Sequence, residues 1–439
     1  MRIIFWNTFL RFSFFFACLM IASSTSGQNL SEYLGLLKNG NIMLDQSENQ
    51  IRASRQDILL AKAALLPSVG ADFNYQRDFT KSYLFINDEE TAAFFGDRFR
   101  TNFNNNITLD IIASQSLYDP SAKATYQLAV LAEEHSRLTH DDFSQGLVNQ
   151  ATQLFWQAIF TRESLKVFEE NQRLAEAQWQ QMRDLFAEGY ASELQVYQTE
   201  SFYKRTVPQL ESAWNTYQIL LNELNALANL PLDYPLELEG EISISDSELA
   251  TYFHADTNLL NNPQLKILRQ QLSIADQQIK VSRTAKHPVI KANLGYNLNA
   301  QDDGFAFDNR INLLYGQIGI QIPIYTGGAT KAQIQKNIIN QENIQLEVRQ
   351  KELTLKKELN NATLNFQNAW QKTKEEKAVI QLNERELEIA EEGIKQGVVT
   401  PLELKEIRLG LMGSKLNLLN AYLDLRIARL QIERIIGNQ

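Results

Sequence analysis

Residues 67–76 read PSVGADFNYQ, and residues 288–299 read PVIKANLGYNLN. In both stretches a proline precedes a strict alternation of apolar residues with small or polar ones. A period of two predicts a β-strand with one apolar and one polar face. The apolar positions are Val69, Ala71, Phe73 and Tyr75 in the first stretch and Ile290, Ala292, Leu294, Tyr296 and Leu298 in the second. We expect strands over about residues 68–80 and 289–300.

A second alternating stretch follows each of these and predicts a returning strand. The returning strands are expected over about residues 106–118 and 311–325, with polar loops at 81–105 and 301–310. Segments of about ten alternating residues joined by polar loops are typical of a transmembrane β-barrel. A soluble antiparallel sheet packed on helices would show the same alternation. Polar faces able to line water, and aromatic residues near the strand ends, favour the barrel.

The two halves of the chain repeat one unit. A shift of 221 positions takes Asn41 to Asn262 and Pro67 to Pro288, and a shift of 208 positions takes Gly189 to Gly397. The change of shift falls between the strands of each hairpin. The expected organisation is a first repeat over 28–230, a linker or equatorial segment over 231–256, and a second repeat over 257–439. Each repeat reads as helix, strand, loop, strand, very long helix, tight turn and long helix.

Very long helices follow the strands in both repeats. Residues 121–188 contain no proline, and residues 329–396 match them in length. At 1.5 Å per residue, such a helix runs roughly 100 Å. Return helices complete long helical hairpins over 121–229 and 329–436. The first return helix has the alternating spacing of four and three that is typical of a coiled coil. The positions are Tyr203, Val207, Leu210, Trp214, Tyr217, Leu221 and Leu224.

Each helical hairpin is predicted to turn at a glycine followed by a capping box. Gly189 precedes the run Ser192-Glu193-Leu194-Gln195, and Gly397 precedes the run Thr400-Pro401-Leu402-Glu403. Glycine suits the left-handed residue that ends a helix. A Ser or Thr with Gln or Glu three residues later caps the first turn of the next helix. Both turns are expected at the end of the molecule farthest from the strands.

Residues 1–27 predict a secretory signal peptide. Arg2 and Arg11 precede an apolar core at residues 14–22, and small residues follow at 23–27. This core is too short to span a membrane; an N-terminal membrane anchor is the alternative. Cys18, the only cysteine, lies in this segment. Lipidation at Cys18 is a further alternative, against which the bulky residues before it argue. Without it, the exported chain has no disulfide or thiol chemistry.

The composition excludes several classes of function. The formal net charge is −10, and an acidic chain without a basic cluster is a poor nucleic-acid binder. No exported segment approaches 18 consecutive apolar residues, so no transmembrane helix is expected. The sequence has no nucleophile-elbow or phosphate-loop motif. The histidines show no metal-ligand spacing, and the runs 133–135 and 140–142 are expected to be solvated helix surface. The four histidines of the chain are His135, His140, His254 and His287. We therefore expect no enzyme activity, no cofactor and no metal site.

Over nearly the whole exported chain, these features resemble the TolC-like outer-membrane efflux protein family, also called outer membrane factors. The segments that carry the resemblance are Leu65-Leu66-Pro67, the run PIYTGG at 323–328, Asn262-Pro263 and the two Gly-x-x-Ser/Thr tips. The first repeat departs from the pattern at residues 117–120, which lack the glycine pair. This departure affects only the expectation for the local turn.

The strands cannot close a barrel within one chain. Four strands are too few, and an open sheet edge in hydrocarbon leaves backbone groups unsatisfied. Three chains would supply 12 strands, enough for a tube with a lumen, whereas two would supply eight, which side chains nearly fill. The fold expected is mainly α with a small β part. A homotrimer would form a 12-stranded barrel in outer-membrane lipid, continuous with a periplasmic α-helical tunnel.

The resemblance implies a function as well as a fold. It implies a bacterial outer-membrane channel-tunnel, mostly periplasmic, that exports drugs and other toxic small molecules as the exit duct of a tripartite efflux pump. It also implies two partners, a periplasmic adaptor (membrane fusion) protein and an inner-membrane pump of the RND or ABC type. The alternatives are an exit duct for type I protein secretion and a secreted, soluble coiled-coil scaffold.

The resemblance also assigns residues. Carried over, the adaptor-docking tips comprise Gly189, Ser192, Leu194, Gly397, Thr400 and Leu402. The family carries acidic residues six and nine positions after the second tip glycine, at the periplasmic aperture. The corresponding aperture residues here are Glu403 and Glu406, with Gln195 and Gln198 in the first repeat. The alternative for the glutamates is that they only complement the helix dipole.

Overall fold

The computed structural model describes residues 28–437, except 87, 89, 91–92, 94–95 and 245–258. The expected signal peptide with Cys18, His254 and much of the expected linker lie outside the described residues. The first half of the chain, expected to be the first repeat, contains α1 (Leu30–Gly40), α2 (Ile42–Ala63), β1 (Ser68–Arg77), β2 (Tyr83–Phe85), β3 (Arg98–Arg100), β4 (Asn105–Tyr118), α4 (Pro120–Ala187) and α5 (Glu193–Leu227). The second contains η1 (Leu259–Asn261), α7 (Pro263–Thr284), β5 (Val289–Asp302), β6 (Asn309–Gln321), α8 (Ala329–Lys395) and α9 (Pro401–Ile436).

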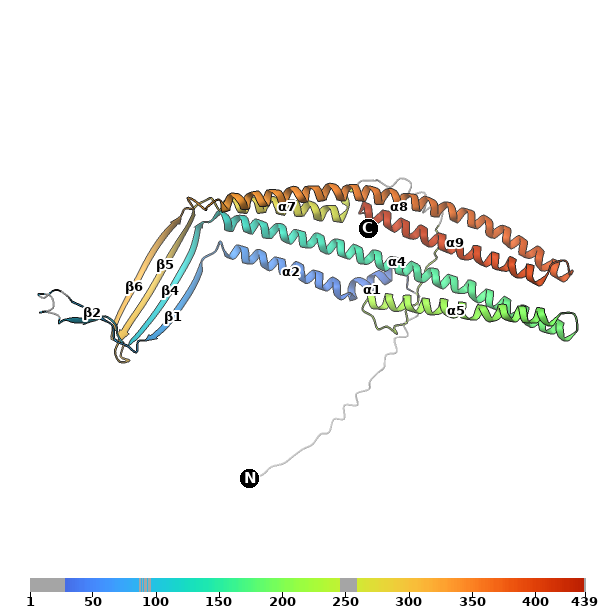
Figure 1. Cartoon of the computed structure of the whole chain (residues 1–439), viewed down its shortest axis with the longest axis horizontal. Coiled ribbons are helices and arrows are strands. Elements are labelled where there is room, and N and C mark those ends of the chain that lie inside the picture. The colour runs from blue at the N-terminus through green and yellow to red at the C-terminus, as the bar shows by residue number, and fades with distance from the viewer. Residues whose placement is uncertain are drawn as a thin grey trace, which may run out of the picture.

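The molecule is long, with the sheet at one end and the helical turns at the other (Figure 1). β1, β4, β5 and β6 form one antiparallel sheet in that order, so the central pair β4–β5 joins the two repeats. From the sheet, the helices run side by side to the α4–α5 and α8–α9 turns. The chain is mainly helical, as expected. In the part of the chain that is described, no helix is both long and apolar enough to cross a bilayer.

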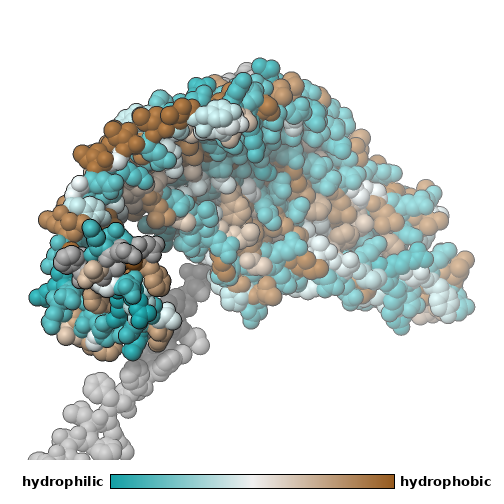
Figure 2. Space-filling model, turned by 60° about the vertical axis from the view of Figure 1, so that its left-hand side comes forward, coloured by the Kyte–Doolittle hydropathy of each residue, from teal (hydrophilic) through white to brown (hydrophobic). Residues whose placement is uncertain are grey.

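The register of the sheet places the alternating apolar residues of β1, β4 and β5 on one face, together with the aliphatic residues of β6 from Leu314 to Ile320; Ile311 and Leu313 of β6 lie on the other face. Tyr75 lies opposite Ile107, Ile111 lies opposite Tyr296, and Tyr296 lies opposite Leu314. Directly opposed residues of antiparallel strands share a face, so the rows align across the sheet. Many of these side chains are exposed, and Figure 2 shows apolar residues along the upper left margin of the sheet end. The sheet therefore exposes an apolar surface that no described part of the chain covers.

The helices form a layer whose order matches that of the strands. α4 packs against α2 and α5 on one side and against α7 and α9 on the other, and α8 packs on α7 and α9. The layer is thus bounded by α2 with α5 at one edge and by α8 at the other. Since α2 leads into β1 and β6 leads into α8, the sheet and the helical layer end at the same two edges.

Equivalent asparagines join helices that lie end to end in each repeat. The Asn41 side chain caps α2 by accepting from the backbone of Leu44, and its Nδ2 donates to the Leu227 carbonyl over 2.7 Å. Asn262 caps α7 in the same way, and its Nδ2 donates to the Ile435 carbonyl over 2.9 Å. Each asparagine therefore satisfies the start of one helix and the end of another.

The two long helices begin differently. α4 starts at Pro120 behind Asp119, whose carboxylate accepts from the backbone N–H groups of Ser121 and Ala122. α8 starts behind Gly328, which has a φ of 85° and makes no side-chain cap. An aspartate cap in the first repeat therefore takes the place of the glycine pair in the second.

The loop expected over residues 81–105 contains a short hairpin, β2–β3, which the sequence pattern did not predict. The base of this hairpin is bound to the β5–β6 turn of the other repeat. The Asp303 carboxylate accepts from Arg100 Nη1 over 2.6 Å and from the backbone N–H of Asn104 over 3.0 Å. Both bonds lower the pKa of Asp303, the Arg100 bond more strongly, so its carboxylate stays ionised. These two bonds of Asp303, here called the Asp303 latch, connect the base of the β2–β3 hairpin to the β5–β6 turn.

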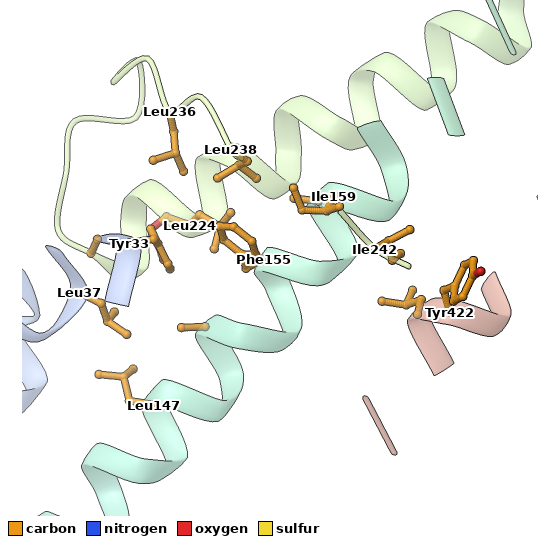
Figure 3. Packing of buried hydrophobic residues seen from close by; sticks show 14 of the residues in the cluster. Tyr33, Leu37, Leu147, Phe155, Ile159, Leu224, Leu236, Leu238, Ile242 and Tyr422 are labelled. Carbon is orange, nitrogen blue, oxygen red and sulfur yellow. The ribbon is translucent and has the colours of Figure 1, made fainter. Parts of the chain in front are cut away.

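The main core lies where α1, α4 and α5 meet an extended segment over residues 236–244, here called the belt (Figure 3). Phe155 is fully buried there, and the hydroxyl of buried Tyr33 donates to the Leu224 carbonyl over 2.9 Å. The belt alternates buried apolar residues with exposed glutamates. The buried ones are Leu236, Leu238, Ile242 and Ile244.

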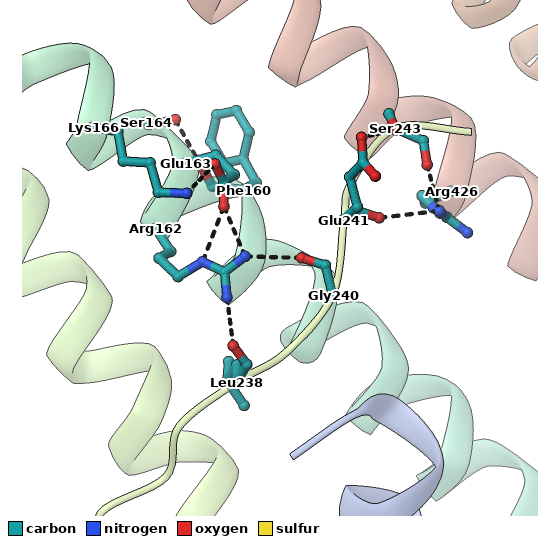
Figure 4. Close-up of polar contacts among 10 residues, drawn as sticks. All are labelled: Phe160, Arg162, Glu163, Ser164, Lys166, Leu238, Gly240, Glu241, Ser243 and Arg426. Carbon is teal, nitrogen blue, oxygen red and sulfur yellow. Dashed lines mark hydrogen bonds and ion pairs between the residues drawn. The ribbon is translucent and has the colours of Figure 1, made fainter. Parts of the chain in front are cut away.

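Two arginines hold the backbone of the belt (Figure 4). Arg162 on α4 donates to the carbonyls of Leu238 and Gly240, and Arg426 on α9 donates to those of Glu241 and Ser243. The belt thus crosses from the first helical hairpin to the second. Because arginine supplies several donors in one plane, each side chain satisfies more than one carbonyl.

His135 and His140 are not solvated helix surface, so that expectation was wrong. Both are half-buried between helices: His135 Nε2 lies 3.2 Å from Gln271 Nε2, and His140 Nδ1 lies 2.6 Å from Ser47 Oγ. The sequence pattern missed this because α4 is covered by α2 and α7 at these positions. Among the described residues, no group of three or more potential metal ligands comes together.

Glu133 is also buried, against the same expectation. Its carboxylate accepts from Arg137 Nε over 2.7 Å and from Arg55 Nε over 3.2 Å. Burial pushes the pKa of Glu133 up, but the hydrogen bonds and charges of Arg137 and Arg55 together hold it below its usual value. The ion pair between Glu133 and Arg55 thus links α4 to α2 at neutral pH.

Candidate functional site

The first helical tip has the turn that the sequence predicted. Gly189 has a φ of 83°, in the left-handed region that glycine adopts without strain. Ser192 then caps α5: its hydroxyl accepts from the backbone N–H of Gln195, and Gln195 Oε1 accepts from the backbone N–H of Ser192 over 2.8 Å. This reciprocal pair of bonds is the predicted capping box.

The second tip repeats this geometry with different residues. Gly397 has a φ of 71°, and the hydroxyl of Thr400 accepts from the backbone N–H of Glu403. Glu403 Oε2 in turn accepts from the backbone N–H of Thr400 over 2.7 Å and from its hydroxyl over 2.8 Å. Pro401 is the first helical residue of α9. Both tips lie at the same end of the molecule (Figure 1).

The tips present apolar side chains to solvent. Leu194 and Leu402, two of the expected docking residues, are exposed. Tyr190 and Val398 are more exposed still, at 81% and 76%, and sequence reasoning did not single them out. Their position directly after the tip glycines was the available signal. Among the other residues expected at the docking tips, Gly189 and Gly397 form the turns, and Ser192 and Thr400 cap the helices that follow.

The expected aperture residues divide into two kinds. Glu403 and Gln195 are both held in capping boxes, whereas Glu406 and Gln198 are exposed. In the described part of the chain, no residue binds the Glu406 carboxylate. The backbone N–H of Thr400, followed by its hydroxyl, lowers the pKa of Glu403. The charged cap at Glu403 therefore persists below the usual glutamate range and is lost only as the pH falls through that lowered pKa.

The polar face of the sheet brings together residues that the sequence did not connect. Asp72 lies directly opposite Asp110, and Asp110 lies opposite Asn297. Asn297 Nδ2 donates to Asp110 Oδ1 over 2.6 Å. Two like charges opposed on neighbouring strands destabilise a sheet unless water or counterions screen them. The sequence showed Asp72 only as one polar neighbour in an alternating strand, because pairing depends on the register between strands.

The chain thus combines an elongated layer of helices, a sheet with one apolar face and two helical tips. The family model described as outer membrane efflux protein matches residues 34–230 and 255–438, which is most of the chain. The protein belongs to the outer membrane efflux protein family. The resemblance found in the sequence is therefore confirmed, and the soluble scaffold is set aside. The protein is an export duct located in the outer membrane, with a periplasmic helical tunnel.

Individual members of the outer membrane efflux protein family are only distantly similar. The proteases secretion protein PrtF of Dickeya chrysanthemi is 21% identical over 342 residues, which cover 75% of this chain and 72% of PrtF. The pyoverdine export outer membrane protein OpmQ of Pseudomonas putida is 22% identical over 321 residues, which cover 72% of this chain and 66% of OpmQ. The outer membrane protein VceC of Vibrio cholerae has the same fold, with a TM-score of 0.75, 13% identity, and coverage of 93% of this chain and 96% of VceC.

Proposed function

We propose that three copies of the chain close into a 12-stranded barrel and a helical tunnel that exports small molecules. The observation that carries this proposal is the pair of matching open edges. β1 and β6 are the outer strands of the sheet, and α2 with α5 and α8 are the outer helices of the layer. Joining the first edge of one copy to the second edge of the next gives a ring, which closes when the rotation per copy matches.

Both edges carry apolar side chains that this arrangement would cover. On α8 they are Ile339, Leu346 and Leu353, exposed and seven residues apart. A seven-residue repeat is the spacing of a coiled-coil seam. On the opposite edge the exposed apolar side chains are Leu59 and Leu60 of α2 and Trp214 and Ile219 of α5. Helix therefore would pack on helix between copies, while strand pairs with strand.

The trimer is testable by measuring the mass of the full-length protein in mild detergent. Light scattering coupled to size exclusion, corrected for bound detergent, is expected to give three chains per particle. A particle with one chain that still conducts ions in a planar bilayer would contradict the proposal, because four strands cannot close a pore.

Small molecules are the proposed cargo, supported by the similarity to OpmQ, which is named as a pyoverdine export protein. Protein secretion is the second candidate, supported by the similarity to PrtF, which is named as a proteases secretion protein. The partners proposed are a periplasmic adaptor at the two tips and an inner-membrane pump of the RND or ABC type.

A Gram-negative strain lacking this protein should accumulate a fluorescent dye more than the complemented strain. Unchanged dye levels with loss of a secreted protein would favour the second candidate.

Glu406, more than Glu403, is proposed to set ion preference at the periplasmic aperture. A trimer would place a ring of free carboxylates there, which favours cations. Glu406→Gln should therefore shift the reversal potential in a salt gradient across a planar bilayer toward lower cation preference. The matched control is Glu403→Gln, since Gln195 already forms the same cap in the first repeat. Equal shifts from both variants would contradict this assignment.

The Asp72–Asp110 pair is proposed to line the barrel lumen. The pair lies on the face opposite the apolar rows, so a trimer would carry six carboxylates at one level of the barrel. Replacing both with asparagine should lower cation preference in the same bilayer measurement and leave the trimer intact, because a like-charge pair is removed. Unaltered selectivity in the double variant would place the two aspartates outside the ion path.

A further inference from the structure

A cavity of about 340 Å³ lies between the two helical hairpins, close to their tips. α4, α5 and α9 line it, so it touches both hairpins. Its lining includes Gln178, Tyr197, Phe202, Arg205, Leu402 and Lys405. The cavity opens to the surface, and its volume falls at the lower end of the range of about 300–1,000 Å³ that is usual for small-molecule sites.

Two cations line this cavity without a carboxylate partner. Within the described residues, neither Arg205 nor Lys405 forms an ion pair. The ammonium of Lys405 lies 5.1 Å from the ring centroid of Phe202, within the range of a cation–π contact. The neighbouring carboxylate of Glu403 is occupied in its capping box. The cavity therefore combines positive charge with an aromatic wall.

A buried amide completes the lining. Gln178 is 93% buried, since only 7% of its surface is exposed. Its Nε2 lies 3.5 Å from the Pro401 carbonyl, and its Oε1 lies 3.4 Å from Arg408 Nη1. Both distances are long for hydrogen bonds of this kind. The amide is therefore weakly held by protein partners, and a ligand could supply a better one.

We propose that this inter-hairpin cavity binds a small organic anion with a flat aromatic body. Arg205 and Lys405 would bind the anionic group, because guanidinium and ammonium groups form charge-assisted hydrogen bonds with carboxylates and sulfonates. Phe202 and Tyr197 would pack on the aromatic body, and the Gln178 amide would donate to a remaining oxygen. Such a ligand contacts α5 and α9 at once, so it stabilises the present spacing of the two hairpins.

The test uses naphthalene-2-sulfonate and the full-length protein in detergent, titrated by calorimetry against matched empty micelles. Saturable binding is expected. Arg205→Gln and Lys405→Gln should each weaken it about tenfold, the usual effect of losing one charged contact of about 1.4 kcal/mol. The uncharged naphthalene-2-sulfonamide should bind more weakly than the sulfonate.

The matched control is Lys204→Gln, one residue away on α5. The ammonium of Lys204 lies 6.0 Å from the Tyr203 ring, and Lys204 does not line the cavity. This variant should bind like the unaltered protein. Absence of saturable binding to the unaltered protein would overturn the proposal, as would equal weakening by Lys204→Gln and Arg205→Gln. Ion conduction across a planar bilayer, measured on the same samples, tests the proposed duct separately. A protein that conducts ions but does not bind the sulfonate contradicts only the cavity proposal.

Discussion

Leu314→Arg is expected to prevent the protein from assembling in the outer membrane. Leu314 lies near the middle of β6, on the apolar face, and is 70% exposed. An arginine facing lipid near the bilayer midplane costs about 2–4 kcal/mol. Since every chain of a trimer would carry the change, the cost rises to about 6–12 kcal/mol per assembly, which is comparable with the whole stability of a typical domain. The measurement is the amount of trimer in outer-membrane fractions.

The matched control for this prediction is the neighbouring Leu313→Arg. Leu313 is also an exposed leucine of β6, but successive residues of a strand point to opposite faces, so it lies on the polar face with Asn297. An arginine there would face water in the lumen, and trimer should form normally. If both variants assembled equally well, the apolar face would not be the lipid face. If both failed equally, overall destabilisation would explain the result instead.

Asn262→Ala should lower the stability of the second repeat by about 2–4 kcal/mol. The change removes the cap of α7, worth about 1 kcal/mol, and leaves the Ile435 carbonyl without its buried donor, at a cost of about 1–3 kcal/mol. Asn262 is 3% exposed, so water cannot easily replace the amide. Thermal unfolding followed by circular dichroism of the detergent-solubilised protein measures the loss.

Two further variants control the Asn262 experiment. Asn261→Ala alters the adjacent, exposed asparagine and should leave the unfolding temperature nearly unchanged. Asn41→Ala should resemble Asn262→Ala, because Asn41 makes the same two contacts in the first repeat. Equal losses from Asn261→Ala and Asn262→Ala would contradict the junction role.

The two helical tips share one backbone geometry but close it with different residues. Both tips use a left-handed glycine and a reciprocal capping box, but the box closes with Gln195 in one and with Glu403 in the other. The cap needs only an acceptor oxygen, which both residues supply. Charge at this position is therefore not required for the turn. This separates the structural role of Glu403 from the proposed electrostatic role of Glu406.

The sequence by itself determined the local elements of this protein. The alternation at residues 68–76 and 289–298 predicted strands with one apolar face, because a strand turns each successive side chain over. Gly189 with Ser192 and Gly397 with Thr400 predicted the helical turns, because capping depends on residues within one turn of each other. Short-range rules of this kind need no partner from elsewhere in the chain.

Only the tertiary structure decided which distant residues meet. The Asp72–Asp110 pair, the Asp303 latch and the cavity beside Lys405 all depend on strand register or on the packing of separate helices. His135, His140 and Glu133 look like surface residues in a polar stretch of helix, yet neighbouring helices cover them. Periodicity indicates which face of a helix or strand is apolar, but it does not indicate which neighbouring element covers its other faces. That choice comes from long-range packing, in which contacts between separate elements outweigh local preference.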